Sequence, residues 1–333
     1  MDHGLRPPGP GRGDERRGGA PRSDQGDTLV RADRLRRANV RTETVAVLAC
    51  ALAWSAGLAG AAPPADVAAD AQLRARRDTY HPVTELLRAK AVRLSDEQVE
   101  KLKGFPLEAV WASVQQLGYT NAHMSGLRST RPNEPLVGRA LTIRYLPRRP
   151  DLVEAMQALA KEGDWPVAYN VRAGEEAKPG DVLVVDLGGG VPDGIFFGDI
   201  SALAAQLQGA RGAVLYGSTR DLTELRAMAG FPVLAVGFDP RPASQIGVDW
   251  NVPVRVGGAT VLPGDAVVAD DEAVVFFPGS IADEVIARAT RVVEQENHER
   301  ALARTKQHRF RDVYPMSPEL RKKFEEEKKE NKP

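Results

Sequence analysis

The chain has 333 residues, with 45 basic and 45 acidic side chains, so its formal net charge is zero. This balance argues against a dedicated nucleic-acid-binding protein, which carries a strongly basic surface, and the 42% hydrophobic content argues against a fully disordered chain. The single cysteine, Cys50, excludes an intramolecular disulfide framework and a cysteine-based zinc site.

The N-terminal region contains two segments of different character. Residues 1–43 are rich in arginine, glycine, aspartate and proline, and we expect them to be disordered. Residues 45–62 form an uncharged, alanine-rich run that follows several arginines and ends in Ala59-Gly60-Ala61. This pattern is typical of a secretory signal peptide, so residues 44–62 are predicted to direct export to the periplasm or outside the cell, with cleavage near Ala61 and no stable membrane insertion afterwards. The alternatives are a membrane anchor formed by residues 45–62 and a buried alanine-rich helix.

The next segment is predicted to be helical. Residues 66–103 are polar and amphipathic, and Ser95-Asp96-Glu97-Gln98 has the pattern of a capping box. A second helix is predicted over residues 107–117, where apolar residues recur on one face. Both helices are expected to belong to one domain that covers residues 66–305.

From residue 136 onward, many short apolar runs predict strands. The predicted strands cover residues 140–145, 181–186, 212–216, 233–236, 252–256, 267–269 and 273–277, and the predicted short helices cover residues 200–207 and 222–228. Short helices among many strands predict layered α/β sheets rather than a regular βαβ repeat. A long helix is predicted from about residue 280, and residues 306–333 are expected to be a charged tail that is frayed or helical with little core.

The most informative side chains are Asp199 and the pair Arg220-Asp221, which are separated by twenty residues. Asp199 is expected where a helix begins, and free amide groups there favour anions. Arg220-Asp221 is expected directly after a buried strand, a favoured ligand position in α/β folds. Two carboxylates and a guanidinium suit a hard divalent cation together with an anionic substrate. The alternative is that Asp199 and Asp221 are helix N-caps and that Arg220 is a surface ion-pair partner.

Several segments, in order along residues 136–300, resemble the RraA-like family. These segments are 180–186, 197–200, 209–214, 217–221, 232–233, 256–261, 263–265 and Asp270. The family contains metal-dependent 4-hydroxy-4-methyl-2-oxoglutarate aldolases and oxaloacetate decarboxylases, alongside regulators of RNase E activity. The resemblance implies an α/β fold, a β/β/α sandwich of the swivelling-domain type, assembled as a homotrimer or a dimer of trimers, here with extra N-terminal helices and a C-terminal helical tail.

The resemblance also implies roles for the central residues. Asp221 would be the direct protein ligand of Mg²⁺ or Mn²⁺, and Asp199 would hold a metal-bound water. Arg220 would bind the pyruvyl end of a small 2-oxo acid substrate. Gly198 and the amides of Ile200 and Ser201 would bind the substrate carboxylate.

The family also takes a carboxylate from the C-terminal helix of a neighbouring subunit. Glu296, four residues before Arg300, is the best match for this group, which would reach the metal through water. Glu294 is the second choice.

The function implied is a divalent-metal-dependent C–C lyase. It would release pyruvate from 4-hydroxy-2-oxo acids and would also decarboxylate oxaloacetate, because both reactions pass through the enolate of pyruvate. One rival is a non-catalytic RraA-like binding or regulatory trimer. The other is a secreted, catalytically silent trimeric module that binds a partner through its extra helices. Nucleic acid is not an expected partner.

Overall fold

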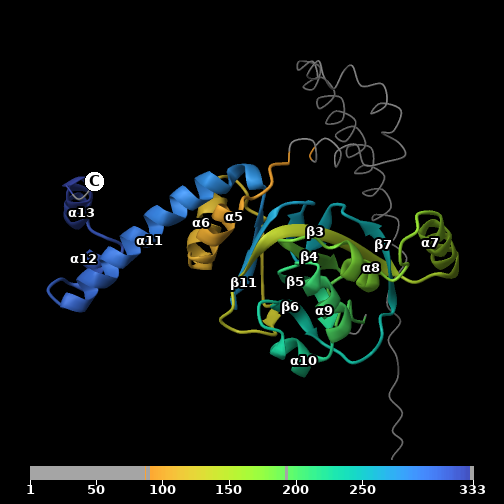
Figure 1. Ribbon diagram of the computed structural model, residues 1–333. Helices are drawn as coiled ribbons and strands as arrows, with labels where there is room; N and C mark the ends of the chain where they lie inside the picture. The colour runs from red at the N-terminus through yellow and green to blue at the C-terminus, as the bar shows by residue number, and fades with distance from the viewer. Residues whose placement is uncertain (1–86, 88–90, 192–193, 331–333) are drawn as a thin grey trace, which may run out of the picture. The chain divides into compact units, whose positions relative to one another are not determined.

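The computed structural model describes residue 87 and residues 91–191 and 194–330 (Figure 1). The predictions of a disordered segment at 1–43, a signal peptide at 44–62 and helical structure at 66–86 lie outside the described residues. Among the residues that are described, no helix has both the length and the apolar character needed to cross a membrane.

A nine-stranded sheet forms the centre of the domain. Its strands are β1 (His123–Ser125), β2 (Arg128–Ser129), β3 (Leu136–Pro147), β4 (Asp181–Asp186), β5 (Gly212–Thr219), β6 (Val233–Phe238), β7 (Gln245–Trp250), β10 (Ala266–Ala269) and β11 (Ala273–Phe277). Their order is β1-β11-β10-β3-β4-β5-β6-β2, with β7 paired to β3. The four central strands β3, β4, β5 and β6 are parallel, and the pairings of the outer strands and of β7 are antiparallel.

Helices connect the four parallel strands. They are α7 (Pro150–Glu162) and α8 (Tyr169–Glu176) between β3 and β4, α9 (Asp199–Leu207) between β4 and β5, and α10 (Leu222–Ala227) between β5 and β6. The prediction that a regular βαβ repeat is absent is therefore wrong for this part of the chain. Helices α7 and α8 were not predicted, although apolar residues recur at helical spacing in α7, at Val153, Met156 and Ala160.

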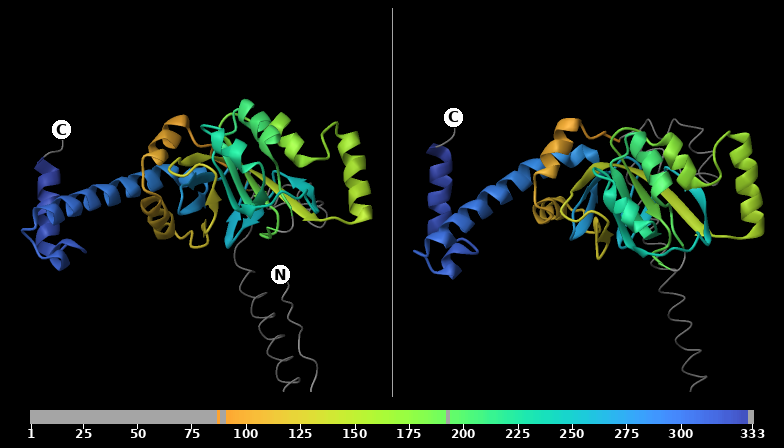
Figure 2. Two further views of the ribbon diagram at one scale, coloured as in Figure 1. Left: turned by 90° about the horizontal axis from the view of Figure 1, so that it is seen from below. Right: turned by 60° about the horizontal axis from the view of Figure 1, so that its bottom comes forward.

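Alternate side chains of the central strands face two different layers, as the strand period of two requires. On β4, Leu183 and Val185 pack in the core beneath the helices, and Figure 2 shows α8 and α9 (green) together over that face. Val182 and Val184 pack instead against a two-stranded sheet of β8 (Val254–Val256) and β9 (Ala259–Val261). The layers are thus β/β/α, as the family resemblance implied.

A third core joins the first described helices to the edge of the sheet. Helices α5 (Asp96–Lys103), α6 (Leu107–Gln116) and α11 (Ala282–Thr305), the last preceded by a 3₁₀ turn at Gly279–Ile281, pack against β10 and β11. The predicted capping box is confirmed, because Ser95 accepts from the Gln98 amide and the Gln98 side chain accepts from the Ser95 amide.

The C-terminal segment has a small core of its own. Helices α12 (Phe310–Val313) and α13 (Pro318–Glu330) follow α11. Val313, Met316 and Leu320 are buried together, with Leu302 of α11 and Phe324 packed against them. The segment up to residue 330 is therefore held by apolar contacts rather than frayed.

Asp265, in the turn before β10, is a buried carboxylate whose titration should be visible in the stability of the protein. Its Oδ2 accepts a 2.8 Å hydrogen bond from the Leu262 amide, but burial dominates and raises its pKa to about 6. Between about pH 4 and pH 6 the folded protein then binds more protons than the unfolded chain, so stability falls as the pH rises through this window. Across this window the free energy of unfolding falls by on the order of 2 to 3 kcal/mol.

We therefore expect Asp265→Asn, which keeps an acceptor for Leu262, to have a higher Tm than wild type at pH 7 and a similar Tm at pH 4. Thermal unfolding from pH 4 to 8 measures both. If the Tm of the two proteins changed with pH in the same way, the raised pKa would not belong to Asp265.

Candidate functional site at the ends of β5 and the start of α9

Asp221 has an unusual backbone conformation that directs its side chain away from its own helix. Its φ of 58° and ψ of 46° are left-handed, and its side chain makes no capping hydrogen bond to α10. Instead, Oδ2 of Asp221 accepts a 3.2 Å hydrogen bond from the amide of Asp199. Asp199 is the first residue of α9, and the N-cap is Gly198. The alternative that both aspartates are N-caps is therefore wrong for Asp199, whereas Asp221 does occupy the N-cap position of α10 but makes no side-chain capping hydrogen bond there. The two predicted segments meet in space.

Gly198 allows this close approach. A β-carbon at Gly198 would lie 1.9 Å from Oδ2 of Asp221 and 3.1 Å from Nε of Arg220. The carboxylate and the guanidinium thus both lie over the bare Cα, so that Gly198 is a steric requirement of the site.

Two buried hydroxyl groups fix the end of β5 against the loop that leads into α9. Thr219 Oγ1 donates to the Phe197 carbonyl at 3.0 Å, and Ser218 Oγ donates to the Gly194 carbonyl at 2.7 Å. The Phe196 amide donates to the Ser218 carbonyl at 3.1 Å. These hydroxyls were not among the predicted functional residues, although two small polar residues at the end of an apolar strand are a usable signal for such anchoring.

The charged groups of the cluster are open to a ligand. Arg220 Nε lies 3.4 Å from Asp221 Oδ2, and the two side chains are 43% and 35% exposed. Such an exposed pair adds little to stability. Among the described residues, neither Oδ1 of Asp221 nor the carboxylate of Asp199 has a hydrogen-bond or ion-pair partner. These oxygens are therefore available to a cation or to water.

The donor set fits a hard divalent cation that keeps most of its water. Within the described part of the chain, no group of three or more His, Cys, Asp or Glu side chains is arranged to enclose a metal. Mg²⁺ is commonly bound through one or two carboxylates, with waters and substrate oxygens completing its shell. The carboxylates of Asp221 and Asp199 are ligands of the type that this minimal set requires.

The first turn of α9 provides donors for an anion. The first amides of a helix have no partner within the helix and lie at the positive end of its dipole. The N–H groups of Ile200 and Ser201 belong to this first turn, which starts at Asp199. The Ser201 hydroxyl accepts a 3.0 Å hydrogen bond from Asn170 of α8. The Ile200 side chain is 78% exposed.

Glu296 and Glu294 are not brought to this cluster within one chain. Both lie on α11, which packs over β10 and β11, whereas α9 packs over the central strands of the sheet (Figure 1). Glu296 pairs with Arg300, and burial together with the Glu296 charge raises the pKa of Glu108 on α6. Glu294 pairs with Lys328 of α13. Their contribution to a neighbouring subunit stays a prediction.

Known proteins with the same architecture and sequence pattern were found by comparison. Residues 92–276 match the model of the RraA-like family, described as Aldolase/RraA. The chain is 34% identical over 105 residues to a 4-hydroxy-4-methyl-2-oxoglutarate aldolase of Thermus thermophilus, with 31% of this chain and 63% of that protein covered. It is 32% identical over 135 residues to a Halalkalibacterium halodurans protein to which the same activity is provisionally assigned, with 40% and 63% covered. The chain thus spans 63% of the length of these two relatives.

A solved structure gives a similar result for the fold. The crystal structure of Streptomyces coelicolor RraAS2, described as an unusual member of the RNase ES inhibitor RraA protein family, superimposes with a TM-score of 0.54 at 30% identity. The superposition covers 63% of this chain and 99% of that one.

Proposed function

The chain belongs to the RraA-like family, and from this premise we propose that it is a divalent-metal-dependent C–C lyase. It would release pyruvate from 4-hydroxy-2-oxo acids and would also decarboxylate oxaloacetate. The observation that carries the proposal is the contact between Asp221 Oδ2 and the Asp199 amide, with Arg220 beside it. This contact brings together a carboxylate, the first turn of a helix and a guanidinium, the groups that the proposed metal and substrate would need. The aldolase names of two relatives support the same reaction class.

Arg220 would orient the substrate. Its planar guanidinium can donate two parallel hydrogen bonds to a 2-oxo acid, which a lysine ammonium cannot reproduce. The substrate carboxylate would then accept from the amides of Ile200 and Ser201 at the start of α9.

Asp221 would hold Mg²⁺ or Mn²⁺ directly, and Asp199 would hold it through water. A divalent cation bound there supplies Lewis-acid stabilisation of the negative charge that develops on the oxo oxygen. Asp199 has no partner among the described residues, so its carboxylate is free to accept the proton of the 4-hydroxyl through a water molecule. In the decarboxylation, the same proton route would deliver a proton to the carbon that loses CO₂.

We further propose that a second copy of the chain covers α9. Ile200, Leu203 and Leu207 lie on one face of this helix and are 78%, 48% and 78% exposed. A stripe of this kind beside the site suits an interface between subunits, in agreement with the homotrimer or dimer of trimers that the family resemblance implies. Light scattering at micromolar concentration measures the mass, and a fully active monomer would contradict this assembly.

The activity is tested by pyruvate formation from 4-hydroxy-4-methyl-2-oxoglutarate and from oxaloacetate. We expect formation in the presence of Mg²⁺ or Mn²⁺, its loss with EDTA and its recovery when metal is added back. Because free metal ions decarboxylate oxaloacetate slowly, the rate with metal but without protein is subtracted. No pyruvate from either substrate with either metal would refute the proposal.

The second candidate function is that of a non-catalytic binding or regulatory trimer. It is favoured by the similarity to RraAS2, which is described as a member of an RNase ES inhibitor family. The superposition covers 99% of the RraAS2 chain. A metal-loaded oligomer that forms no pyruvate would be the result expected of this candidate.

A further inference from the structure

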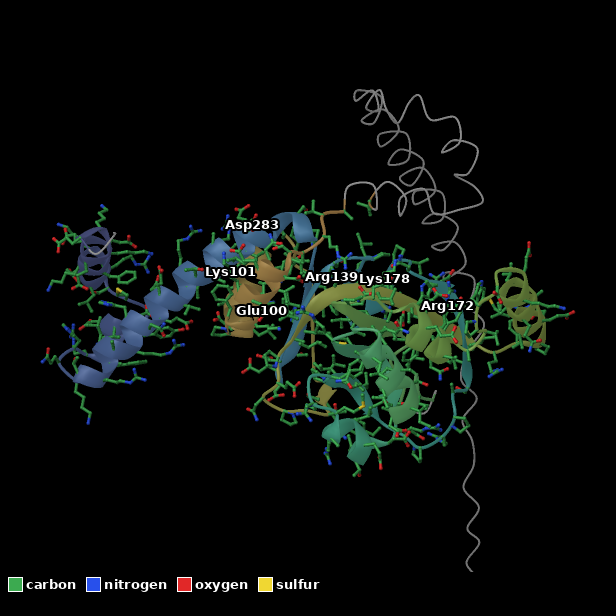
Figure 3. The ribbon with its side chains drawn as sticks, in the orientation of Figure 1. Glu100, Lys101, Arg139, Arg172, Lys178 and Asp283 are labelled. Atoms are coloured by element: carbon green, nitrogen blue, oxygen red, sulfur yellow. The ribbon has the colours of Figure 1, made fainter. Side chains whose placement is uncertain are left out.

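A cavity of about 340 Å³ lies near the N-terminal end of β4, whereas the candidate active site lies at the C-terminal end of β5. Its charged and polar lining includes Arg93, Arg139, Lys178, Asp181, Trp250 and Asn251. Arg139 of β3 is in register with Asp181, the first residue of β4, whereas Arg220 follows the last residue of β5. The eight residues of β5 alone span roughly 25 Å, so the two places are separate. Figure 3 shows Arg139 and Lys178 next to each other above β3.

Two guanidinium groups in this cavity share one neutral acceptor. Arg93 Nη2 donates to the Pro179 carbonyl oxygen at 3.3 Å, and Arg139 Nη2 donates to the same oxygen. Neither arginine forms an ion pair with another described residue. Like charges this close repel each other, and a carbonyl dipole compensates them less than an anion would.

Arg139 cannot relieve this repulsion by moving into solvent. It is only 6% exposed, and its Nε is buried without a hydrogen-bond partner in the part of the chain that the structure describes. Burial, followed by the neighbouring charge of Arg93, lowers the pKa of Arg139. Arg139 is therefore a fixed positive charge in the cavity lining, whereas Arg93 and Lys178 are exposed and free to turn towards a ligand.

The acidic groups of the cavity leave a positive excess. Glu176 is paired with Arg172 at 2.8 Å. Asp181 accepts from the Lys178 amide at 2.9 Å, and burial raises its pKa although three cations oppose the shift. Among the described residues that line the cavity, three cations thus face one carboxylate that forms no ion pair with another described residue. Outside the lining, Arg211 approaches two carboxylates on α5 at 3.9 Å.

We propose that this cavity binds a small dianionic ligand, either a phosphate monoester or a dicarboxylate. Arg93 and Lys178 contact the ligand directly, and the buried charge of Arg139 adds a positive electrostatic potential that attracts it. Two net positive charges match a dianion, and a guanidinium beside an ammonium suits tetrahedral or planar oxyanions. The volume admits a metabolite rather than a macromolecular segment. Leu141 and Trp250 are apolar members of the lining and suit the carbon part of such a ligand.

The test uses the full-length protein with inorganic phosphate and, separately, succinate as probes, at constant ionic strength and without divalent metal. We expect at least one probe to raise the Tm and to bind in titration calorimetry. Arg93→Gln and Lys178→Gln should each weaken this binding at least tenfold. Arg148→Gln, which removes an exposed positive charge without a partner among the described residues, should bind as wild type does.

The two probes identify the ligand chemistry, because a response to phosphate alone indicates a phosphate group and a response to succinate alone indicates a dicarboxylate. Binding must also persist in Arg220→Gln, which separates this cavity from the candidate active site. The proposal is overturned if neither probe binds, if Arg148→Gln weakens binding as much as Arg93→Gln does, or if only Arg220→Gln abolishes it.

Discussion

Asp221→Asn is expected to lose at least about a hundredfold of the metal-dependent pyruvate formation while its Tm stays close to that of wild type. The amide is neutral, so it loses most of its attraction for a divalent cation that has few other protein ligands. The fold should survive because asparagine tolerates the left-handed φ of 58° at this position at least as well as aspartate does. The remaining carbonyl oxygen can still accept from the Asp199 amide.

A matched control exists elsewhere in the chain. Asp164 also has a left-handed φ, 51°, and is exposed outside the cluster, so Asp164→Asn makes the same chemical change at a similar backbone geometry. It should leave both activity and Tm unchanged. Full activity in Asp221→Asn would show that Asp221 is not the metal ligand, and the main support for the lyase proposal would be lost. A large fall in Tm would instead show that Asp221 is needed for the fold.

The positions of the site residues could be predicted because they depend on local signals. A glycine before an apolar run marks the start of α9, and a buried apolar strand followed by charged residues marks the end of β5. These signals place Asp199 and Asp221 at element junctions, as the structure confirms. Their meeting in space follows from the parallel order of β4 and β5, which the sequence pattern alone does not define.

The direction of the Asp221 side chain could not be predicted. A left-handed backbone at a residue other than glycine depends on tertiary contacts, so the sequence left open whether Asp221 caps α10 or contacts α9. The same limit applies to the small C-terminal core, because Leu320 and Phe324 are isolated among charges in the sequence. They become a core only when folding brings Val313, Met316 and Leu302 against them. Glu296 shows a further limit, since a role in a neighbouring subunit depends on an interface that no single chain contains.

Gly198→Ala is the second change expected to have a large effect, and it tests the geometry rather than the charge of the site. The backbone of Gly198, with φ of −112° and ψ of −165°, is accessible to alanine. The added methyl group would nevertheless lie 1.9 Å from Asp221 Oδ2. Because half-exposed side chains move more easily than buried backbone, we expect the Asp221 carboxylate and Arg220 to be displaced while the fold is retained. The loss of activity should be at least about a hundredfold, since displacements on the order of 1 Å are costly in catalysis.

The matched control for this substitution is Gly258→Ala. Gly258 does not have a left-handed φ, and a β-carbon there would meet no atom within 4 Å, so the change adds the same methyl group without a collision. We expect this variant to keep the wild-type activity and Tm. If Gly198→Ala were equally active, the approach of Asp221 to the start of α9 would be irrelevant to the reaction, even if Asp221→Asn were inactive. If Gly198→Ala lost activity while its Tm fell by only a few degrees, the contact between Asp221 and the Asp199 amide would be the geometry that the reaction requires, because no charged group has been altered.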